Sequence, residues 1–159
     1  MFKLIGAAVV ILSAGLFGMK KYNELFERKR ILQEIYDGCV QVGNSLRCMC
    51  LPLHEGFLCG GRFFESAAEK IGGGMLPCEA VKDTARSFHV LKAEDLRIIE
   101  RFAEGLIAHD CAGQLSNTEF FTQSLKGEIE NAIRELNSRG KLYVKGSILT
   151  ATAVVLLLI

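Results

Sequence analysis

Two uncharged apolar stretches near the ends of the chain constrain its fold more than any other feature. No charged residue occurs in 4–19 or in 146–159, whereas almost every charge lies in 20–145. As helices, these stretches extend about 24 Å and about 21 Å, against a bilayer hydrocarbon core of about 30 Å. Snorkelling lysines beside each stretch can make up the difference. The sequence therefore predicts transmembrane segments at 1–21 and 142–159.

Two other interpretations of these ends were weighed against membrane insertion. In the first, the stretch at 146–159 forms a buried core helix, but a run with no polar face is hard to bury in so small a domain. In the second, the stretch at 4–19 is a cleaved signal peptide, which would place the six cysteines in an oxidising compartment. No A-x-A cleavage site precedes the first charges, however, and the basic residues follow the apolar run instead of preceding it. Membrane insertion of both ends is the preferred prediction.

Basic residues beside the two stretches indicate where the middle of the chain lies. Lys20 and Lys21 follow the first stretch, and Lys141 and Lys145 flank the start of the second. Because loops rich in Lys and Arg stay on the cytoplasmic side of a membrane, we expect the domain at 22–141 to be cytoplasmic. Its cysteines are then expected to be reduced.

The domain at 22–141 shows helical periodicity throughout. Apolar residues from Leu25 to Met49 recur at spacings of three, four and seven, as in an amphipathic or coiled-coil helix. The sequence Ser116-Asn117-Thr118-Glu119 fits a capping box that would begin the last helix. Helices are expected at 22–50, 53–71, 78–90 and 94–108, and from 116 onward. No segment alternates with period two, so the predicted fold is all-α: a helical bundle whose long amphipathic helices continue into both transmembrane helices.

A cluster of cysteines with one histidine at 47–60 resembles a metal or thiol site. Cys48 and Cys50 are two residues apart on a helix, so their side chains diverge by about 200° and cannot bind one ion together. Cys50, His54 and Cys59 could still meet across a turn, but no C-x-x-C pair is present. The favoured interpretation is a helix corner.

The sequence His109-Asp110-Cys111 is the second apparent site. A histidine in the last turn of a helix favours the negative end of the helix dipole, and Asp110 can cap the turn that follows. His89 has no recognisable partner. We therefore expect no catalytic, cofactor-binding or metal-binding residue, and the balanced net charge of +1 gives no reason to expect a nucleic acid partner.

Several short motifs resemble the stage III sporulation protein AB family of endospore-forming bacteria. The start Phe2-Lys3-Leu4-Ile5-Gly6 and the basic helix after it are similar to the family's N-terminus. Pro52, Leu53 and Glu55 resemble its Pro-Leu-x-Glu-Ala element, with Gly56 in place of alanine. Leu106, Asp110 and Gln114 resemble its Leu-Gly-x-x-Asp-x-x-x-Gln element, with Ile107 in place of glycine. These six matching residues are predicted to form structural or partner-facing turns.

The resemblance implies a non-enzymatic role without a cofactor. It implies a platform in the mother-cell membrane around the forespore, within a transenvelope complex, similar to inner-membrane platforms of type II secretion and type IV pilus systems. The expected partners are the membrane, the other stage III sporulation A-set proteins, in particular the AA-type ATPase, and possibly further copies of the chain. Two alternatives stay open: a membrane-tethered coiled-coil module that uses Leu25 to Met49 between chains, and a membrane-anchored metal or thiol enzyme.

Overall fold

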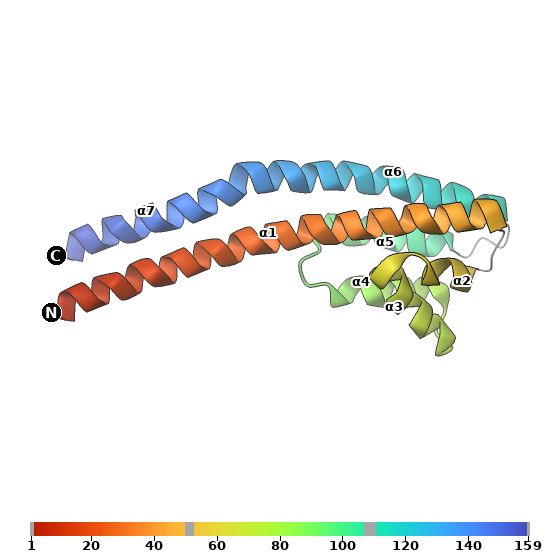
Figure 1. Cartoon of the computed structure of the whole chain (residues 1–159), viewed down its shortest axis with the longest axis horizontal. Coiled ribbons are helices and arrows are strands. Elements are labelled where there is room, and N and C mark those ends of the chain that lie inside the picture. Colours follow the sequence, from red (N-terminus) through yellow and green to blue (C-terminus); the bar gives the residue numbers. More distant parts are fainter. Residues whose placement is uncertain (1, 50–52, 107–110, 159) are drawn as a thin grey trace. The chain divides into compact units, whose positions relative to one another are not determined.

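The described backbone consists of helices joined by short turns. The computed structural model describes residues 2–49, 53–106 and 111–158, and within them all side chains except those of 2–11, 49, 111, 144, 148 and 156–158. The helices are α1 (Phe2–Met49), α2 (Leu53–Leu58), α3 (Gly61–Gly72), α4 (Pro77–Ser87), α5 (Ala93–Gly105), α6 (Cys111–Glu135), the π-helix η1 (Leu136–Gly140) and α7 (Lys141–Leu158) (Figure 1). These ranges contain no strand, which confirms the all-α prediction.

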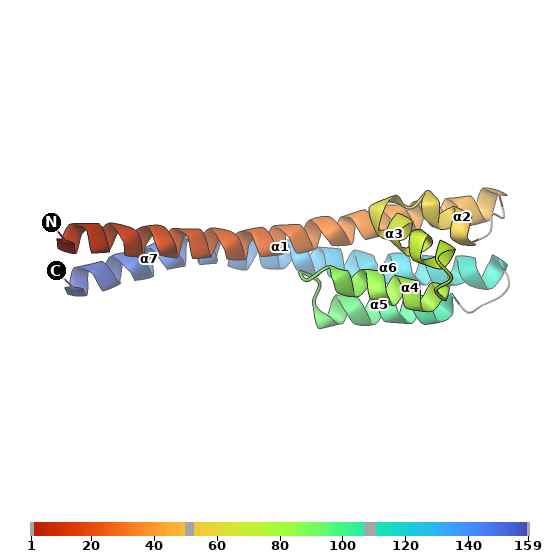
Figure 2. The same cartoon turned by 90° about the horizontal axis from the view of Figure 1, so that it is seen from below.

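The chain divides into two compact units, which we describe separately. Unit 1 comprises 1–29 and 131–159, and unit 2 comprises 30–130. Within unit 2, the short helices α2 to α5 gather beside the second half of α1 (Figures 1 and 2). The predicted boundaries 1–21, 22–141 and 142–159 concern membrane limits and stay a prediction.

Unit 2 is built on the apolar stripe of α1 and a set of phenylalanines. The stripe residues Leu32, Ile35, Cys39, Val42 and Leu46 are almost completely buried inside the chain. The aromatic rings form a continuous series of contacts, with centroid distances of 4.2–6.3 Å, through Phe57, Phe63, Phe64, Phe88, Phe102 and Phe121. Since the stripe packs within one chain, this part of α1 has no free apolar face for the coiled-coil alternative.

The predicted single helix at 53–71 is two helices, α2 and α3. The chain turns at Cys59–Gly60, and Gly61 has a φ of 76°, a left-handed conformation that favours glycine. The turn lies directly against α1, because a Cβ atom on Gly38 would stand 1.9 Å from the carbonyl oxygen of Gly60. The prediction was wrong here because this contact joins glycines that are far apart in sequence.

The turn between α3 and α4 follows the prediction more closely. Gly74 has a φ of 93°; its N–H donates to the Ile71 carbonyl at 2.9 Å, and the Met75 N–H donates to the Lys70 carbonyl at 3.1 Å. This pair of bonds is the Schellman arrangement that ends many helices. Pro77 then begins α4, where a proline needs no N–H partner. The triple glycine Gly72-Gly73-Gly74 therefore ends α3, one residue beyond the predicted end at 71.

The capping box predicted at 116–119 does not begin a helix. Helix α6 already starts at Cys111, and the Thr118 hydroxyl donates back to the Gln114 carbonyl at 2.8 Å inside that helix. Asn117 instead donates to the Phe102 carbonyl of α5 at 2.9 Å. A polar side chain that satisfies a carbonyl near the end of a different helix looks, in sequence, like a cap of its own helix.

Unit 1 consists of the first part of α1 together with the end of α6, η1 and α7. Helix α7 runs beside α1, and the first turn of α1 and the last turn of α7 lie at the same end (Figures 1 and 2). A Cβ on Gly18 would stand 2.4 Å from Ser147 Oγ, and one on Gly140 would stand 3.0 Å from the ring of Tyr22. Gly18 of the first apolar stretch therefore lies against Ser147 of the second.

The structure does not support the prediction of transmembrane helices at 1–21 and 142–159. Among the residues with described side chains, no helix combines enough length and apolar character to cross a membrane. Residues 1–11 and 156–159 fall outside the described side chains.

Candidate functional site

The family-motif residues near the first predicted turn lie at the start of α2. Leu53 is the first residue of this six-residue helix and is half-buried, whereas Glu55 is exposed in its first turn. A carboxylate in the first turn complements the positive end of the helix dipole. Pro52 lies outside the described residues. Of this motif, Glu55 is thus available to a partner and Leu53 is partly packed.

The second family motif spans the passage from α5 to α6. Leu106 is buried at the end of α5, where its N–H donates to the Ala103 carbonyl at 3.2 Å. Gln114 is half-buried in α6, and its carbonyl accepts the Thr118 hydroxyl. Asp110, with His109, lies outside the described residues. These positions are consistent with a structural role for Leu106 and Gln114, which stays a prediction.

The cysteine cluster at 47–60 is spread over a helix end and a turn. Cys48 and Cys59 are exposed, Cys50 is outside the described residues, and His54 is half-buried in α2. In the described part of the chain, no group of three or more His, Cys, Asp or Glu side chains is placed to hold a metal ion. The described side chains of this segment therefore form no common centre.

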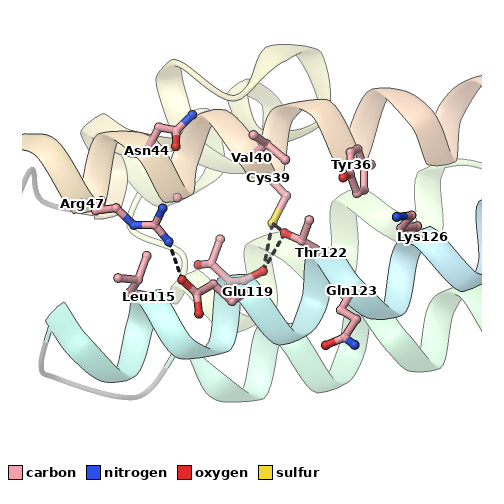
Figure 3. A pocket seen from close by; sticks show the side chains of 12 residues that line it. Tyr36, Cys39, Val40, Asn44, Arg47, Leu115, Glu119, Thr122, Gln123 and Lys126 are labelled. Atoms are coloured by element: carbon pink, nitrogen blue, oxygen red, sulfur yellow. Dashed lines mark hydrogen bonds and ion pairs between the residues drawn. The ribbon is translucent and has the colours of Figure 1, made fainter.

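Unit 2 contains a groove of about 330 Å³ between α1 and α6, lined by both polar and apolar side chains (Figure 3). The lining residues are Tyr36, Cys39, Val40, Gly43, Asn44, Arg47, Leu115, Thr118, Glu119, Thr122, Gln123 and Lys126. Arg47 and Glu119 form an ion pair across one end of the groove. Both side chains are more than half exposed, so solvent weakens the contribution of this pair to stability.

Cys39 lies at the floor of this groove and is fully buried. Its thiol donates to the Thr118 carbonyl at 3.7 Å and lies 3.3 Å from the Thr122 hydroxyl (Figure 3). Burial raises the pKa of the Cys39 thiol to about 12, and the contact with Thr122 offsets only part of that rise. A thiol with so high a pKa is a poor nucleophile near neutral pH. Cys39 therefore serves packing.

Unit 1 contains a second and larger groove, of about 590 Å³, between α1 and α7. Its lining is mostly apolar or small: Ser13, Ala14, Phe17, Leu142, Tyr143, Gly146, Ser147, Thr150, Ala151 and Val154. Eight of these residues, all except Leu142 and Tyr143, lie in the two uncharged stretches 4–19 and 146–159. No feature of the sequence predicted this groove.

In unit 1, an ion pair with a buried arginine joins α1 to the end of α6. Arg28 is almost fully buried and donates to Glu135 at 3.1 Å, and Arg139 binds the other oxygen of the same carboxylate at 3.1 Å. Glu135 stands immediately before η1. Single-turn π-helices often occur at functional positions. No local sequence pattern indicates this contact, because Arg28 and Glu135 are 107 residues apart.

The two units carry opposite net charge. Unit 1 holds nine Lys and Arg against three Asp and Glu, which gives +6, and unit 2 holds ten against fifteen, which gives −5. Unit 1 also exposes large apolar side chains, with Leu16 68% and Leu149 70% exposed. Sequence reasoning missed this division because unit 1 joins the two ends of the chain.

Comparison with known proteins bears on the whole chain at once. A family model described as stage III sporulation protein AB matches residues 3–159. No curated protein and no solved structure gives a match. The family match covers nearly the entire sequence and confirms the resemblance drawn from the short motifs.

Proposed function

Because the chain belongs to the stage III sporulation protein AB family, it has a sporulation-related role, and we propose that it acts there as a non-enzymatic membrane platform. In this proposal unit 1 attaches the protein to the mother-cell membrane around the forespore. Unit 2 stands on the cytoplasmic side and receives the AA-type ATPase of the same protein set. The platform thereby couples this ATPase to the transenvelope complex.

The observation that carries the proposal is the chemical contrast between the two units. Unit 1 is basic and exposes large apolar side chains, among them Leu12, Leu16, Phe17, Leu142 and Leu149. Exposed apolar patches of this kind mark contact with lipid or with another protein. Unit 2 is acidic, and five of its phenylalanines are almost completely buried, whereas Phe120 is exposed. This division suits a protein in which one unit attaches to a membrane and the other docks a partner.

Ion pairs between neighbouring helices of unit 2 support a scaffold role. Ion pairs join α3 to α4 (Lys70–Asp83, 2.8 Å) and α4 to α5 (Lys82–Glu104, 3.1 Å, and Arg86–Glu100, 3.2 Å). Each pair is at least partly exposed and contributes little to stability by itself. Together they favour one arrangement of the three helices, which is useful for a docking surface.

The buried state of Cys39 favours a scaffold over a thiol enzyme. Its raised pKa and its packing under α6 give no accessible thiolate. An activated cysteine would need an electropositive, partly exposed setting. The proposal therefore assigns unit 2 a binding role.

Co-purification from sporulating cells tests this function. Full-length tagged protein is solubilised from membranes, and the bound AA-type ATPase is quantified by mass spectrometry. Glu55→Lys reverses an exposed charge in the family motif of α2, and Glu65→Lys reverses an equally exposed charge in α3 as the matched control. We expect the unaltered protein and Glu65→Lys to retain the ATPase, and Glu55→Lys to lose it about tenfold, as a change of about 1.4 kcal/mol would produce.

The outcomes separate the role from the docking face. If the unaltered protein recovers no ATPase above an untagged control, the platform role is wrong. If both variants retain the ATPase equally, the role stands and the face around Glu55 is not the docking face.

A further inference from the structure

The apolar groove of unit 1 ends beside a group of lysines. Leu142 and Tyr143 line one end of the groove, and Phe17 lines the facing side. Lys141 and Lys145 lie on α7 within three residues of Leu142, and Lys20 and Lys21 follow Phe17 by about one helical turn. We call Lys20, Lys21, Lys141 and Lys145 the lysine collar.

The packing of α1 on α7 places the lysines of the collar at similar positions along this pair of helices. Gly18 lies against Ser147, and Tyr22 lies against Gly140. These two contacts set an antiparallel register, so Lys20 and Lys21 come level with the start of α7. The position of Tyr143 agrees, since it lies close enough to Lys21 to contribute to the raised pKa of that amine, behind the larger effect of Glu24.

Positive charge at this level exceeds negative charge. Glu24 binds Lys21 at 2.7 Å, and Lys20 also acts on the same carboxylate. No Asp or Glu occurs in the sequence at 1–23 or at 136–159. Lys20, Lys141 and Lys145 are exposed. The lysine collar therefore presents several cations between the apolar groove and the charged part of unit 1.

From this arrangement we propose that unit 1 binds an anionic phospholipid. One acyl chain lies along the groove between α1 and α7, and the lysine collar holds the phosphate. The groove supplies an apolar surface of suitable chemistry, and cationic side chains beside a bilayer attract anionic headgroups. Snorkelling lysines reach the headgroup level while their methylene stems cover apolar surface. The inference rests on the proposed membrane location and adds a lipid class to it.

A tryptophan in the groove can report which lipid lies there. The chain contains no Trp, so Phe17→Trp introduces a single reporter in the groove lining. The full-length variant is reconstituted into vesicles that contain either brominated phosphatidylglycerol or brominated phosphatidylcholine at equal mole fraction. Bromine quenches a neighbouring indole, so the two quenching curves give the relative binding constant of the two lipids. We expect the anionic lipid to be favoured about fivefold at low salt, and less at high salt.

Two sets of substitutions, each made together with Phe17→Trp, test the collar. Lys20→Gln, Lys141→Gln and Lys145→Gln together remove three charges from the collar. Arg97→Gln, Arg101→Gln and Lys126→Gln remove three exposed charges from unit 2 as the matched control. The collar variant should quench equally with both lipids, and the control should keep the fivefold preference. Inorganic phosphate at millimolar concentration should not displace the brominated anionic lipid, because it lacks the acyl chain.

Each other outcome overturns the proposal in a distinguishable way. Equal quenching by both lipids before any collar substitution means that the groove takes acyl chains without regard to the headgroup. Loss of the preference in the control means that net charge, and not the collar, selects the lipid. Displacement by inorganic phosphate identifies a site for free phosphate. A chain that does not associate with vesicles at all refutes the membrane location of the proposed function as well.

Discussion

Replacing Gly38 by alanine tests the closest approach in unit 2. Gly38 lies inside α1, where alanine normally stabilises a helix over glycine by about 0.8–1 kcal/mol. At this site, however, the added Cβ would stand 1.9 Å from the Gly60 carbonyl oxygen and 2.9 Å from the Phe64 ring. Real Cβ contacts are essentially never shorter than 3.0 Å, so α1 and the α2–α3 turn must separate by about 1.1 Å, the difference between 3.0 and 1.9 Å.

The expected magnitude follows from two opposing terms. Overpacking a buried site commonly costs about 1–3 kcal/mol, and here the obstacle is backbone, which yields less easily than a side chain. With the helix-propensity gain subtracted, the range is about 0–2 kcal/mol; because the obstacle is backbone, we expect the upper half of it, a net loss of about 1–2 kcal/mol. For a chain of this size, that corresponds to a fall in Tm of about 2–8 °C. A fully buried neighbour, Phe64, leaves little free space to absorb the shift.

Gly127→Ala is the matched control. Gly127 lies within α6 in the same unit, and a Cβ there would meet nothing within 4 Å. This variant should gain about 0.5–1 kcal/mol from helix propensity alone. Thermal unfolding of the full-length protein in detergent, followed by far-UV circular dichroism, compares the two variants directly. If Gly38→Ala is as stable as Gly127→Ala, the close approach of α1 to the turn does not exist as described.

Further predictions concern Gly18, Cys39 and Asn117. Gly18→Leu should weaken the packing of α1 on α7, whereas Gly15→Leu should not, because a Cβ at Gly15 meets nothing within 4 Å. The packing is measured by disulfide crosslinking between cysteines placed at Ala14 and Ala151 in a cysteine-free background. Equal crosslinking in both variants would contradict the prediction. Alkylation at pH 8 should label Cys48 and Cys59 but leave Cys39 unmodified until the protein unfolds. Because burial raises the pKa of Cys39 from 9.0 to about 12, the unfolded chain loses this proton first, so the parent should lose stability between about pH 9 and 12 more steeply than Cys39→Ala does. Asn117→Ala should lower the free energy of unfolding by about 1–2 kcal/mol, because its hydrogen bond to the Phe102 carbonyl is lost. Chemical unfolding measures this loss, with Asn131→Ala on the exposed surface of α6 as the comparison. Equal losses in the two variants would show that Asn117 does not cap α5.

Helix positions that depend on local chemistry were predictable from the sequence. Helix α4 begins at Pro77, and α5 begins at Ala93, one residue before the expected start. The triple glycine ends α3 through the left-handed Gly74. In each case the signal and the structure lie within a few residues of one another.

Positions that depend on distant partners were not predictable in the same way. The break at Gly60 makes sense only once Gly38 of α1 lies against it. Asn117 looked like part of a helix start, but its side chain donates to α5, and Gly105 leaves the space that it needs, since a Cβ there would stand 2.3 Å from Asn117 Oδ1. The groove that Cys39 lines forms only where α1 and α6 meet.

The sequence by itself determined the all-α class, the apolar character of both ends and the family, because periodicity, runs of uncharged residues and short motifs are written locally in the chain. Tertiary structure decided which faces those elements use. It buried the α1 stripe inside the chain, joined the two ends into one basic unit of net charge +6 and left an acidic unit of −5 between them in sequence. The physical reason is that packing and charge at a surface depend on which residues meet in space. Arg28 and Glu135, 107 residues apart, form a buried pair only after the chain has folded.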